Sequence, residues 1–347
     1  MPPVFDGHND VLWQQYDRGK AERARFASGN NTHIDVPKAE KGGFGGGFFA
    51  IWVPSDIDGD SITAEMQADS YDLPLPPAIA QDEALQATLA QAAILARLEA
   101  DGALRICTST AEIRACLDNG TMAAIMHIEG AEAIDTDFDT LEVLYRAGLR
   151  SLGPVWSRPT VFAEGVPFRF PSDGDIGGGL TGAGKDLVRE CNRLGIMLDV
   201  SHLNMAGFYD LAEITDAPVV ATHSNAYAIC PHARNLTDDQ LAVIRESGGV
   251  VGLNFATAFL RPDGKMIADT GLDVMLRHLD HLLEHLGEDG VALGSDFDGA
   301  QVPEAIGDSS GLGALRAAMR DHGYDAALMA KICNGNWLRV LARTWRE

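Results

Sequence analysis

Hydrophobic and polar residues follow two repeating patterns along the chain. Short apolar runs rich in β-branched and aromatic residues are typical of buried strands, and longer segments with an apolar residue every three or four positions are typical of amphipathic helices. Eight strand-like runs occur, at residues 4–11, 47–54, 122–129, 149–156, 195–202, 218–224, 249–255 and 290–297. Helical periodicity is clearest at residues 81–100, 182–194 and 272–286. Strand-like and helix-like segments therefore alternate over most of the chain.

This alternation predicts βα units around a parallel sheet, and thus an α/β fold. Eight strands with helices between them, in 347 residues, are what a (β/α)8 barrel, or TIM barrel, requires. We expect a single catalytic domain over residues 1–347, because the chain contains no linker long enough to separate two domains. Two stretches, residues 56–77 and 157–184, are rich in loop-forming residues and are expected to lie like lids over the barrel mouth.

The charge balance is strongly acidic, with 27 basic against 50 acidic residues and a formal net charge of −23. Such a field repels nucleic acid and anionic membranes. No segment has 18 uninterrupted apolar residues, and the first residues do not resemble a signal peptide. The five cysteines are scattered without a CxxC pair, as expected for reduced thiols inside a cell. We therefore expect a cytoplasmic protein that binds neither nucleic acid nor membranes.

Ionisable residues stand at the carboxyl ends of the predicted strands, where the catalytic groups of a parallel barrel collect. They are His8 and Asp10 in the first run, Glu129 in the third, His202 in the fifth, His223 in the sixth and Asp296 in the eighth. His8 and Asp10 are two residues apart, so the strand period directs both side chains to the same side. Any one of these histidines alone is more readily explained as a hydrogen-bonded core residue. Six ionisable groups at one barrel end would be costly to bury without cations, which favours a metal site.

Imidazoles and carboxylates together make a mixed nitrogen and oxygen donor set that suits zinc best, with cobalt or manganese as substitutes. We expect one zinc ion on His8 and Asp10. A second zinc ion would bind His202 and His223, and Glu129 would bridge the two ions.

The chemistry of such a pair of ions indicates a hydrolase. Two ions about 3.5–4 Å apart share a water and lower its pKa towards neutrality, which makes a metal-bound hydroxide available for attack on an amide. Asp296 is left without a ligand role. We expect it to take the proton of the hydroxide as a general base and to deliver it to the departing amine as a general acid.

Six motifs stand in a fixed order along the chain. They are DGHND at residues 6–10, IEG at 128–130, GLTGAGKDLVRECNRLGIMLDVSHLN at 179–204, THSNAYAICPHARNLTDD at 222–239, LGSDFDG at 293–299 and NGNWLRVL at 334–341. Together they closely resemble the renal, or membrane, dipeptidase family (peptidase family M19) of the amidohydrolase superfamily. The resemblance runs over nearly the whole chain and is densest over residues 179–239.

The resemblance implies an amidohydrolase-type barrel with two Zn²⁺ ions on the five residues named above and Asp296 as the acid/base. It also implies hydrolysis of dipeptides, commonly with a D-residue tolerated at the carboxyl side, and a homodimer. Arg234, in HARN, matches the family arginine that holds the substrate carboxylate, and a planar fork of donors suits that task. The alternative for Arg234 is a surface arginine in a loop.

Two departures from the family pattern bear on the site. Where the family commonly has a histidine at the end of the fourth strand to polarise the scissile carbonyl, this chain has Trp156, whose indole offers one N–H donor and no charge. Arg158 is the candidate replacement donor for the oxyanion, and its alternative role is that of a salt-bridge partner in the loop. The second departure follows Glu129, where the family often continues GGH and this chain has Gly130, Ala131 and Glu132. Glu132 is expected to add negative charge to the site. His127 is expected either to hydrogen-bond a metal ligand or to fill the core.

The resulting interpretation is a binuclear zinc dipeptidase. Trp156 and the loop at residues 157–184 leave open a second interpretation, a zinc amidohydrolase that acts on another small amide or a lactam. A third interpretation is a metal-binding homologue without catalytic activity, and it is disfavoured because metal binding alone does not require Asp296.

Overall fold

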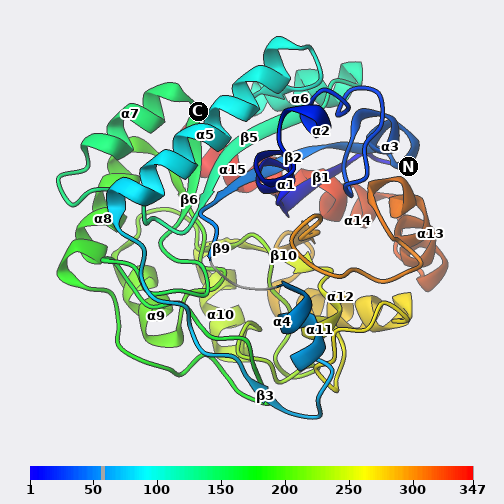
Figure 1. Ribbon diagram of the computed structural model, residues 1–347. Coiled ribbons are helices and arrows are strands. Elements are labelled where there is room, and N and C mark those ends of the chain that lie inside the picture. The colour runs from blue at the N-terminus through cyan, green and yellow to red at the C-terminus, as the bar shows by residue number, and fades with distance from the viewer. Residues whose placement is uncertain (56–58, 347) are drawn as a thin grey trace.

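The structure is a computed structural model that describes residues 1–55 and 59–346. Eight parallel strands form its centre, and helices surround them (Figure 1). In order around the ring the strands are β1 (Val4–Asn9), β2 (Phe44–Trp52), β5 (Ala123–Glu129), β6 (Leu149–Gly153), β8 (Met197–Leu198), β9 (Val220–Ala221), β10 (Val250–Asn254) and β11 (Val291–Gly294). The ring closes where Asp199 pairs with Val220, and where Asn9 pairs with Phe297. Each strand overlaps one of the eight predicted runs, and the predicted (β/α)8 barrel is confirmed.

Helices follow the strands along the chain, and their inner faces pack on the barrel in the main hydrophobic core. They are α1 (Val11–Asp17), α2 (Lys20–Arg23), α3 (Val36–Gly42), α4 (Gly59–Glu65), α5 (Gln81–Ala100), α6 (Thr110–Asn119), α7 (Asp139–Ala147), α8 (Gly182–Leu194), α9 (Met205–Ile214), α10 (Asp238–Ser247), α11 (Thr257–Leu260), α12 (Leu272–Leu286), α13 (Leu312–His322), α14 (Ala326–Ala330) and α15 (Asn336–Trp345), with a 3₁₀ turn at Ser309–Gly311 and a π-helical turn at Lys331–Gly335. Helices α5, α8 and α12 have the bounds that periodicity predicted. Local signals set the ends of α8: the Thr181 hydroxyl accepts a hydrogen bond from the Gly184 amide, and Gly195 adopts a left-handed φ of 73°.

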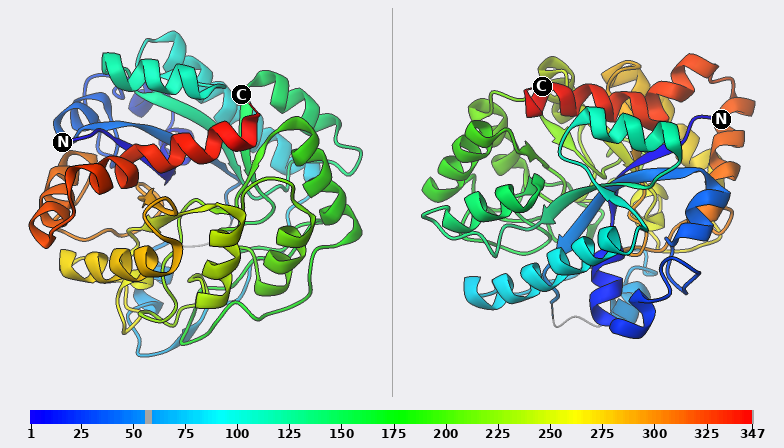
Figure 2. Two further views of the ribbon diagram at one scale, coloured as in Figure 1. Left: turned by 180° about the vertical axis from the view of Figure 1, so that it is seen from behind. Right: turned by 90° about the horizontal axis from the view of Figure 1, so that it is seen from above.

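Apolar side chains fill one end of the barrel interior. The inward-facing residues that pack there are Phe5, Phe48, Ile125, Met197, Val220, Val250 and Ala292. Trp337 of α15, the red helix that crosses the barrel when seen from behind in Figure 2, packs against Phe48 with 5.1 Å between ring centroids. Gly7 leaves space for this ring, since a Cβ there would lie 2.5 Å from Trp337. This end is closed, so a site must lie where the strands end.

The two insertions that were expected to form lids contact each other. Strand β3 (Tyr71–Asp72), from the first insertion, pairs antiparallel with β7 (Arg169–Phe170), from the second. The guanidinium of Arg169 lies 2.7 Å from the carboxylate of Asp72 across this pairing. Beneath the strands, Met66 packs with Phe259 and Met266 in a separate apolar cluster. The pairing was not predicted because both strands lie in insertions rich in loop-forming residues, outside the apolar runs. Residues 56–58, which belong to the first lid as predicted, lie outside the described residues.

One further short strand, β4 (Arg105–Ile106), runs parallel to the start of β5 outside the ring, and the sequence patterns did not predict it. Among the helices in residues 1–55 and 59–346, we find none with the length and apolar character needed to cross a membrane.

Candidate metal centre and active site

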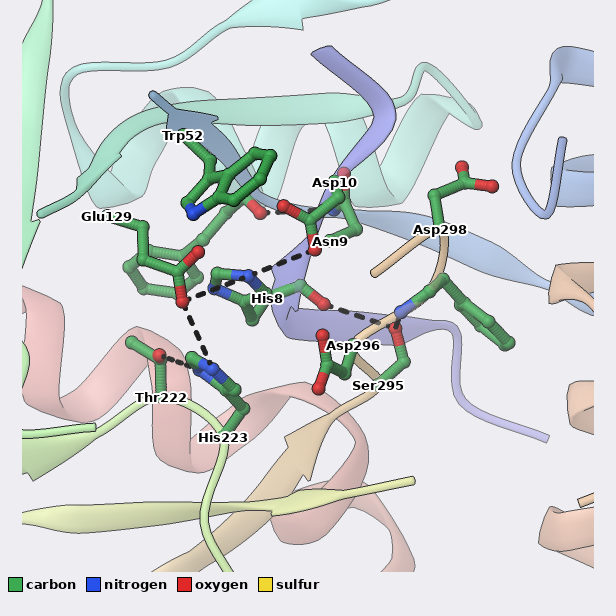
Figure 3. Close-up of polar contacts among 12 residues, drawn as sticks. His8, Asn9, Asp10, Trp52, Glu129, Thr222, His223, Ser295, Asp296 and Asp298 are labelled. Carbon is green, nitrogen blue, oxygen red and sulfur yellow. Dashed lines mark hydrogen bonds and ion pairs between the residues drawn. The ribbon is translucent and has the colours of Figure 1, made fainter. Parts of the chain in front are cut away.

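Three imidazoles converge on one carboxylate where the barrel strands end. The Nε2 atoms of His202, His223 and His8 lie 3.1, 3.4 and 3.7 Å from Oε1 of Glu129. Oδ2 of Asp10 lies 3.4 Å from Nε2 of His8. All five side chains are buried. Figure 3 shows His8, Asp10, Glu129 and His223 pointing towards one another, with His8 and Asp10 at the end of β1, Glu129 at the end of β5 and His223 just after β9. The structure thus brings together all five residues that were predicted as metal ligands.

Hydroxyl groups fix the orientation of two of the rings. Nδ1 of His202 lies 2.8 Å from the Ser157 hydroxyl, and Nδ1 of His223 lies 2.8 Å from the Thr222 hydroxyl. The Thr222 hydroxyl donates its hydrogen to Oδ2 of Asp199 at 2.5 Å, so it must accept from the N–H at Nδ1 of His223. The lone pair of this imidazole is therefore on Nε2, which faces Glu129. This is the arrangement that a metal-binding histidine needs.

The electrostatics of the cluster also fit divalent cations. Burial lowers the pKa of His202 and His223 well below the ordinary value, so both rings are neutral although their Nε2 atoms are only 3.2 Å apart. Burial raises the pKa of Glu129 well above its usual range. Burial also lowers the pKa of His8, but the carboxylates of Glu129 and Asp10 outweigh it and raise the pKa to about 10. A cation between these donors would satisfy the facing lone pairs and the carboxylates together.

The donor atoms form two groups that share one residue. His8, Asp10 and Glu129 form the first, Glu129, His202 and His223 form the second, and within each group the ligand atoms lie within 4.8 Å of one another. Glu129 belongs to both groups, as a bridging ligand requires. The residues present therefore fit a pair of ions with mixed nitrogen and oxygen ligands, and metal binding by these residues stays a prediction.

Asp296 lies beside this cluster with its backbone in an unusual conformation. Its φ is 58°, in the left-handed region that a non-glycine residue seldom adopts, and its amide donates to the His8 carbonyl at 3.0 Å. Asn254 donates to Oδ2 of Asp296 at 2.9 Å. Burial raises the pKa of Asp296, while the proximity of His8 lowers it. His202, with φ of 67°, shares the unusual backbone, and such residues concentrate at functional sites.

A second positive-φ aspartate, Asp298, stands two residues further on and was not singled out from the sequence. Its φ is 72°, and its Oδ1 accepts from the His33 amide at 2.6 Å. Burial raises the pKa of Asp298 to about 7. Asp298 lines the same cavity as Asp296, but Figure 3 shows its carboxylate turned away from His8 and Glu129.

A cavity of about 450 Å³ opens above the cluster. It is lined by Asp10, Trp13, Trp52, Ser55, Ile62, Thr63, Met66, Glu129, Trp156, Phe168, His202, Phe259, Met266, Asp296, Asp298, Gly299, Ala300 and Gln301. The rings of Trp13, Trp52 and Trp156 contact one another edge to face, with centroids 5.0 and 5.2 Å apart. Phe168 continues this wall at 5.7 Å from Trp156. Carboxylates and imidazoles therefore face an aromatic wall across the cavity.

Trp52 is a residue of this wall that sequence reasoning missed. The side-chain amide of Gln91 holds the backbone of Trp52 by two hydrogen bonds: it accepts from the Trp52 N–H at 3.1 Å and donates to the Trp52 carbonyl at 2.6 Å. Its indole nitrogen is buried and has no hydrogen-bond partner among the described residues. Figure 3 shows the ring next to Glu129. The available sequence signal was the place of Trp52 near the end of a predicted strand. In the structure Trp52 pairs with Glu129, which places both residues at the same level of the barrel.

Trp156 lies where the departure from the family pattern suggested, in the cavity wall, with its ring 5.9 Å from the ring of His202. Arg158 does not line the cavity. Its side chain is buried, and its Nε and Nη2 donate to one carboxylate oxygen of Glu132 at 2.9 and 2.7 Å. It also donates to the Ser55 hydroxyl and to the Val53 carbonyl. The oxyanion role expected for Arg158 is therefore corrected to that of a buried salt-bridge partner, and the same contact neutralises Glu132.

Arg234 is buried rather than exposed in a loop. It donates from Nη2 to the His223 carbonyl at 3.1 Å, and its guanidinium lies 5.4 Å from the centre of the Phe259 ring. Burial lowers its pKa to about 10, so it keeps its charge at neutral pH. Its position behind His223 places a cation near the cluster, and its contact with a substrate carboxylate stays a prediction.

His127 fills space beside the cluster. Its Nδ1 lies 2.8 Å from the Ser151 hydroxyl, and its ring meets the ring of His8 edge on at 5.7 Å. It thus positions His8 by packing, and no hydrogen bond is found from it to the predicted ligands, all of which belong to the described residues.

The fold and the buried donor cluster define a metal-dependent hydrolase built on a parallel barrel. The chain belongs to the membrane dipeptidase family, peptidase family M19, whose model matches residues 1–346. A crystal structure of a metallopeptidase from Rhodobacter sphaeroides liganded with a phosphinate mimic of the dipeptide L-Ala-D-Ala is similar to it with a TM-score of 0.97 and 55% identity, over 99% of both chains. The crystal structure of the dipeptidase AC, a metallopeptidase of family M19, has the same TM-score and identity, over 100% of this chain and 99% of that one. An uncharacterized protein in the pqqA 5′ region of Klebsiella pneumoniae is 48% identical over 259 residues, 74% of this chain and 96% of that protein. The protein is therefore a metallo-dipeptidase of this family.

Proposed function

We propose that the protein is a binuclear zinc dipeptidase that accepts a D-residue at the carboxyl side of the scissile bond. The observation that carries the proposal is the convergence of three imidazole Nε2 atoms on the Glu129 carboxylate, at 3.1 to 3.7 Å, beneath a cavity of about 450 Å³. A cavity of this size is within the range for small ligands. The phosphinate mimic of L-Ala-D-Ala in the 55% identical relative supports the choice of substrate.

The chain's own residues would hold the two ions, with Glu129 in both groups of ligands. His8 and Asp10 hold one ion, and His202 and His223 hold the other. When bound, the pair supplies an activated water and polarises the scissile carbonyl. The hydroxyl groups of Ser157 and Thr222 contact Nδ1 of His202 and His223 and keep the Nε2 atoms directed inward, so little rearrangement of these rings is needed when the ions bind.

Asp296 would move the proton. Because burial raises the pKa of its carboxyl group, it can accept a proton at a pH where an exposed aspartate would not hold one. Asn254 fixes one carboxylate oxygen, which leaves the other to accept the proton of the attacking water and to deliver it to the leaving amine. Its position within 4.8 Å of ligand atoms of His8 and His223 is also compatible with metal contact, so the variant test below separates the two roles by metal content.

Arg234 would attract the free carboxylate of the substrate, while Trp52 and Trp156 provide an aromatic wall for its side chains. The same wall is a specific reason to consider a second function, hydrolysis of an apolar N-acyl amino acid or a lactam. Five aromatic rings line the cavity, and aromatic surface favours apolar groups regardless of which amide is cleaved.

The proposal is tested with a library of L-Xaa-D-Xaa and L-Xaa-L-Xaa dipeptides, N-acyl amino acids and lactams, added to zinc-loaded protein. We expect turnover of dipeptides, including those with a D-residue at the carboxyl side. The Asp296→Asn variant is the control, and it should keep its zinc and lose turnover. Turnover of lactams or N-acyl amino acids without dipeptide turnover would overturn the dipeptide assignment and favour the second function.

We also propose that the chain works as a single catalytic domain, in the cytoplasm, as a homodimer. Contact between the two insertions through β3 and β7 supports one domain. All five cysteines are free and buried, which supports a reducing compartment. The homodimer rests on family resemblance alone, and sedimentation velocity measures it directly.

A further inference from the structure

A second group of imidazoles and a carboxylate lies away from the barrel mouth, between α10 and α12. His281 and His285 are one helical turn apart in α12, and Asp238 is the first residue of α10. Nε2 of His281 lies 2.7 Å from Oδ1 of Asp238, and Nε2 of His285 lies 3.8 Å from Oδ2. The ligand atoms of all three residues lie within 4.8 Å of one another. Each carboxylate oxygen thus faces its own imidazole.

An ordinary ion pair explains only half of this arrangement. An aspartate at the start of α10 is favourable next to the helix dipole, and one protonated histidine would complete the pair. The second ring, however, stacks on the first with 4.3 Å between centroids and 25° between planes. Two protonated imidazoles so close would repel each other, whereas a divalent cation binds two neutral imidazole nitrogens and a carboxylate together.

The protein offers an internal comparison for an imidazole paired with a carboxylate at the surface. Nε2 of His322 lies 2.8 Å from Oδ2 of Asp280, and the hydroxyl of Tyr324 donates to the other oxygen at 2.7 Å. The group of Asp280, His322 and Tyr324 has one imidazole and no second nitrogen ligand. It therefore forms a hydrogen-bonded pair and offers too few ligands for a metal ion. The difference between the two groups is the second histidine at the i+4 position, which places two nitrogens on one face of a helix.

The surroundings of the group allow an ion to enter and to complete its coordination with water. The side chains of His281, His285 and Asp238 are 18, 30 and 48% exposed, in contrast with the buried donors at the barrel mouth. Glu246 and Glu284 line an adjoining hollow and add negative charge. Arg245 lines the same hollow and opposes a cation in part, but the overall charge of −23 is strongly favourable.

We propose that Asp238, His281 and His285 form a separate surface site for a divalent transition-metal ion such as Zn²⁺, which links the start of α10 to α12. Two imidazoles and one carboxylate leave a fourth position for water, as is usual for zinc with three protein ligands. The ion joins two helices that are neighbours in the outer layer but are connected in the chain through β10. Its expected effect is therefore on stability and not on turnover.

Metal content of the full chain tests this proposal. Wild-type protein, equilibrated with buffered micromolar Zn²⁺ and desalted, should hold about one more zinc ion per chain than His285→Ala or His281→Ala. The affinity for this additional ion should fall at least about tenfold in each variant, because removal of an outer-shell partner alone costs 10–100-fold. Added Zn²⁺ should raise the Tm of the wild type more than that of the variants, with unchanged turnover in all of them.

His322→Ala is the matched control, since it removes a surface histidine from an aspartate pair and should keep the additional ion. Asp238→Asn is a second route to the same answer if a histidine variant fails to fold. Equal zinc content and an equal zinc-dependent rise in Tm in the wild type, His285→Ala and Asp238→Asn would overturn the proposal. Because the comparison is a difference between variants, it stands apart from the zinc content of the barrel mouth, which is measured by turnover and by variants of Glu129.

Discussion

The two ends of the barrel interior are built from the same strands and have opposite chemistry. On β1, Phe5 packs in the apolar layer, and three residues later His8 faces the ionisable cluster. On β5, Ile125 and Glu129 make the same change within one strand. The apolar end stabilises the barrel by burial, whereas the ionisable end costs free energy unless its charges are compensated. Substitutions at the two ends should therefore separate stability from catalysis.

The largest effect is expected at the ionisable end, from Asp296→Asn. The asparagine keeps the size of the side chain and cannot take up the proton, so kcat should fall about 10²–10⁴-fold, the usual contribution of a general acid/base. Zinc content and Tm should stay close to those of the wild type. The measurement is steady-state kinetics together with metal analysis on the same sample. A loss of zinc in parallel with kcat would show that Asp296 is instead a metal ligand.

The opposite outcome is expected at the apolar end, from Trp337→Ala. Removal of this fully buried ring should lower the free energy of unfolding by about 3–5 kcal/mol, because it leaves a cavity next to Phe48. Denaturant unfolding measures the loss, and kcat per folded molecule should be unchanged at a temperature where the variant is folded. A stable variant with reduced kcat would contradict the division of the barrel into two ends.

Arg158→Met tests the division between the two ends at a residue that was expected to contact the substrate. Arg158 does not line the cavity and is instead buried against Glu132. Its loss leaves Glu132 buried without its partner, which should cost about 3–5 kcal/mol of stability. The double variant Arg158→Met/Glu132→Gln should recover part of that loss, as a double-mutant cycle of unfolding free energies would show. A fall in kcat with no loss of stability would restore the oxyanion role.

The smallest effect is expected from Trp52→Phe, which keeps an aromatic ring in the wall and removes the unpartnered N–H. Loss of one hydrogen bond to a substrate corresponds to about 0.5–1.5 kcal/mol, or roughly two- to twelvefold in kcat/KM. Trp13→Phe is the matched control, since Trp13 contacts the same ring and should have a smaller effect on kcat/KM. Equal values for both variants would mean that Trp52 acts by packing alone.

The sequence predicted the parts of the molecule in which a local pattern is strong. All eight barrel strands follow from short apolar runs, because they are buried on both faces. The bounds of α5, α8 and α12 follow from apolar periodicity, because each helix buries one face against the core. Strands β3 and β7 lie in insertions rich in loop-forming residues, outside the apolar runs, so their pairing could not be predicted. The ionisable residues at the strand ends could be identified as a candidate site because an unpaired charge is costly to bury there.

Contacts between distant loops were not predictable in the same way. Arg158 and Glu132 are 26 residues apart, and nothing in either segment specifies the other as its partner. The sequence indicated a choice between a catalytic and a structural role for Arg158, and burial decided it. Trp52 was not predicted because it does not titrate, although the residue lines the cavity and its buried indole N–H has no partner among the described residues.

The most direct test of the account is the dependence of L-Ala-D-Ala hydrolysis on zinc, added to metal-free protein in measured equivalents. We expect activity to rise until the barrel mouth holds two ions per chain. Glu129→Gln, which weakens the ligand shared by both groups, should hold fewer ions and stay inactive. The His285→Ala background removes the surface ion from the count. Full activity without metal, or unchanged activity and zinc content in Glu129→Gln, would contradict the account.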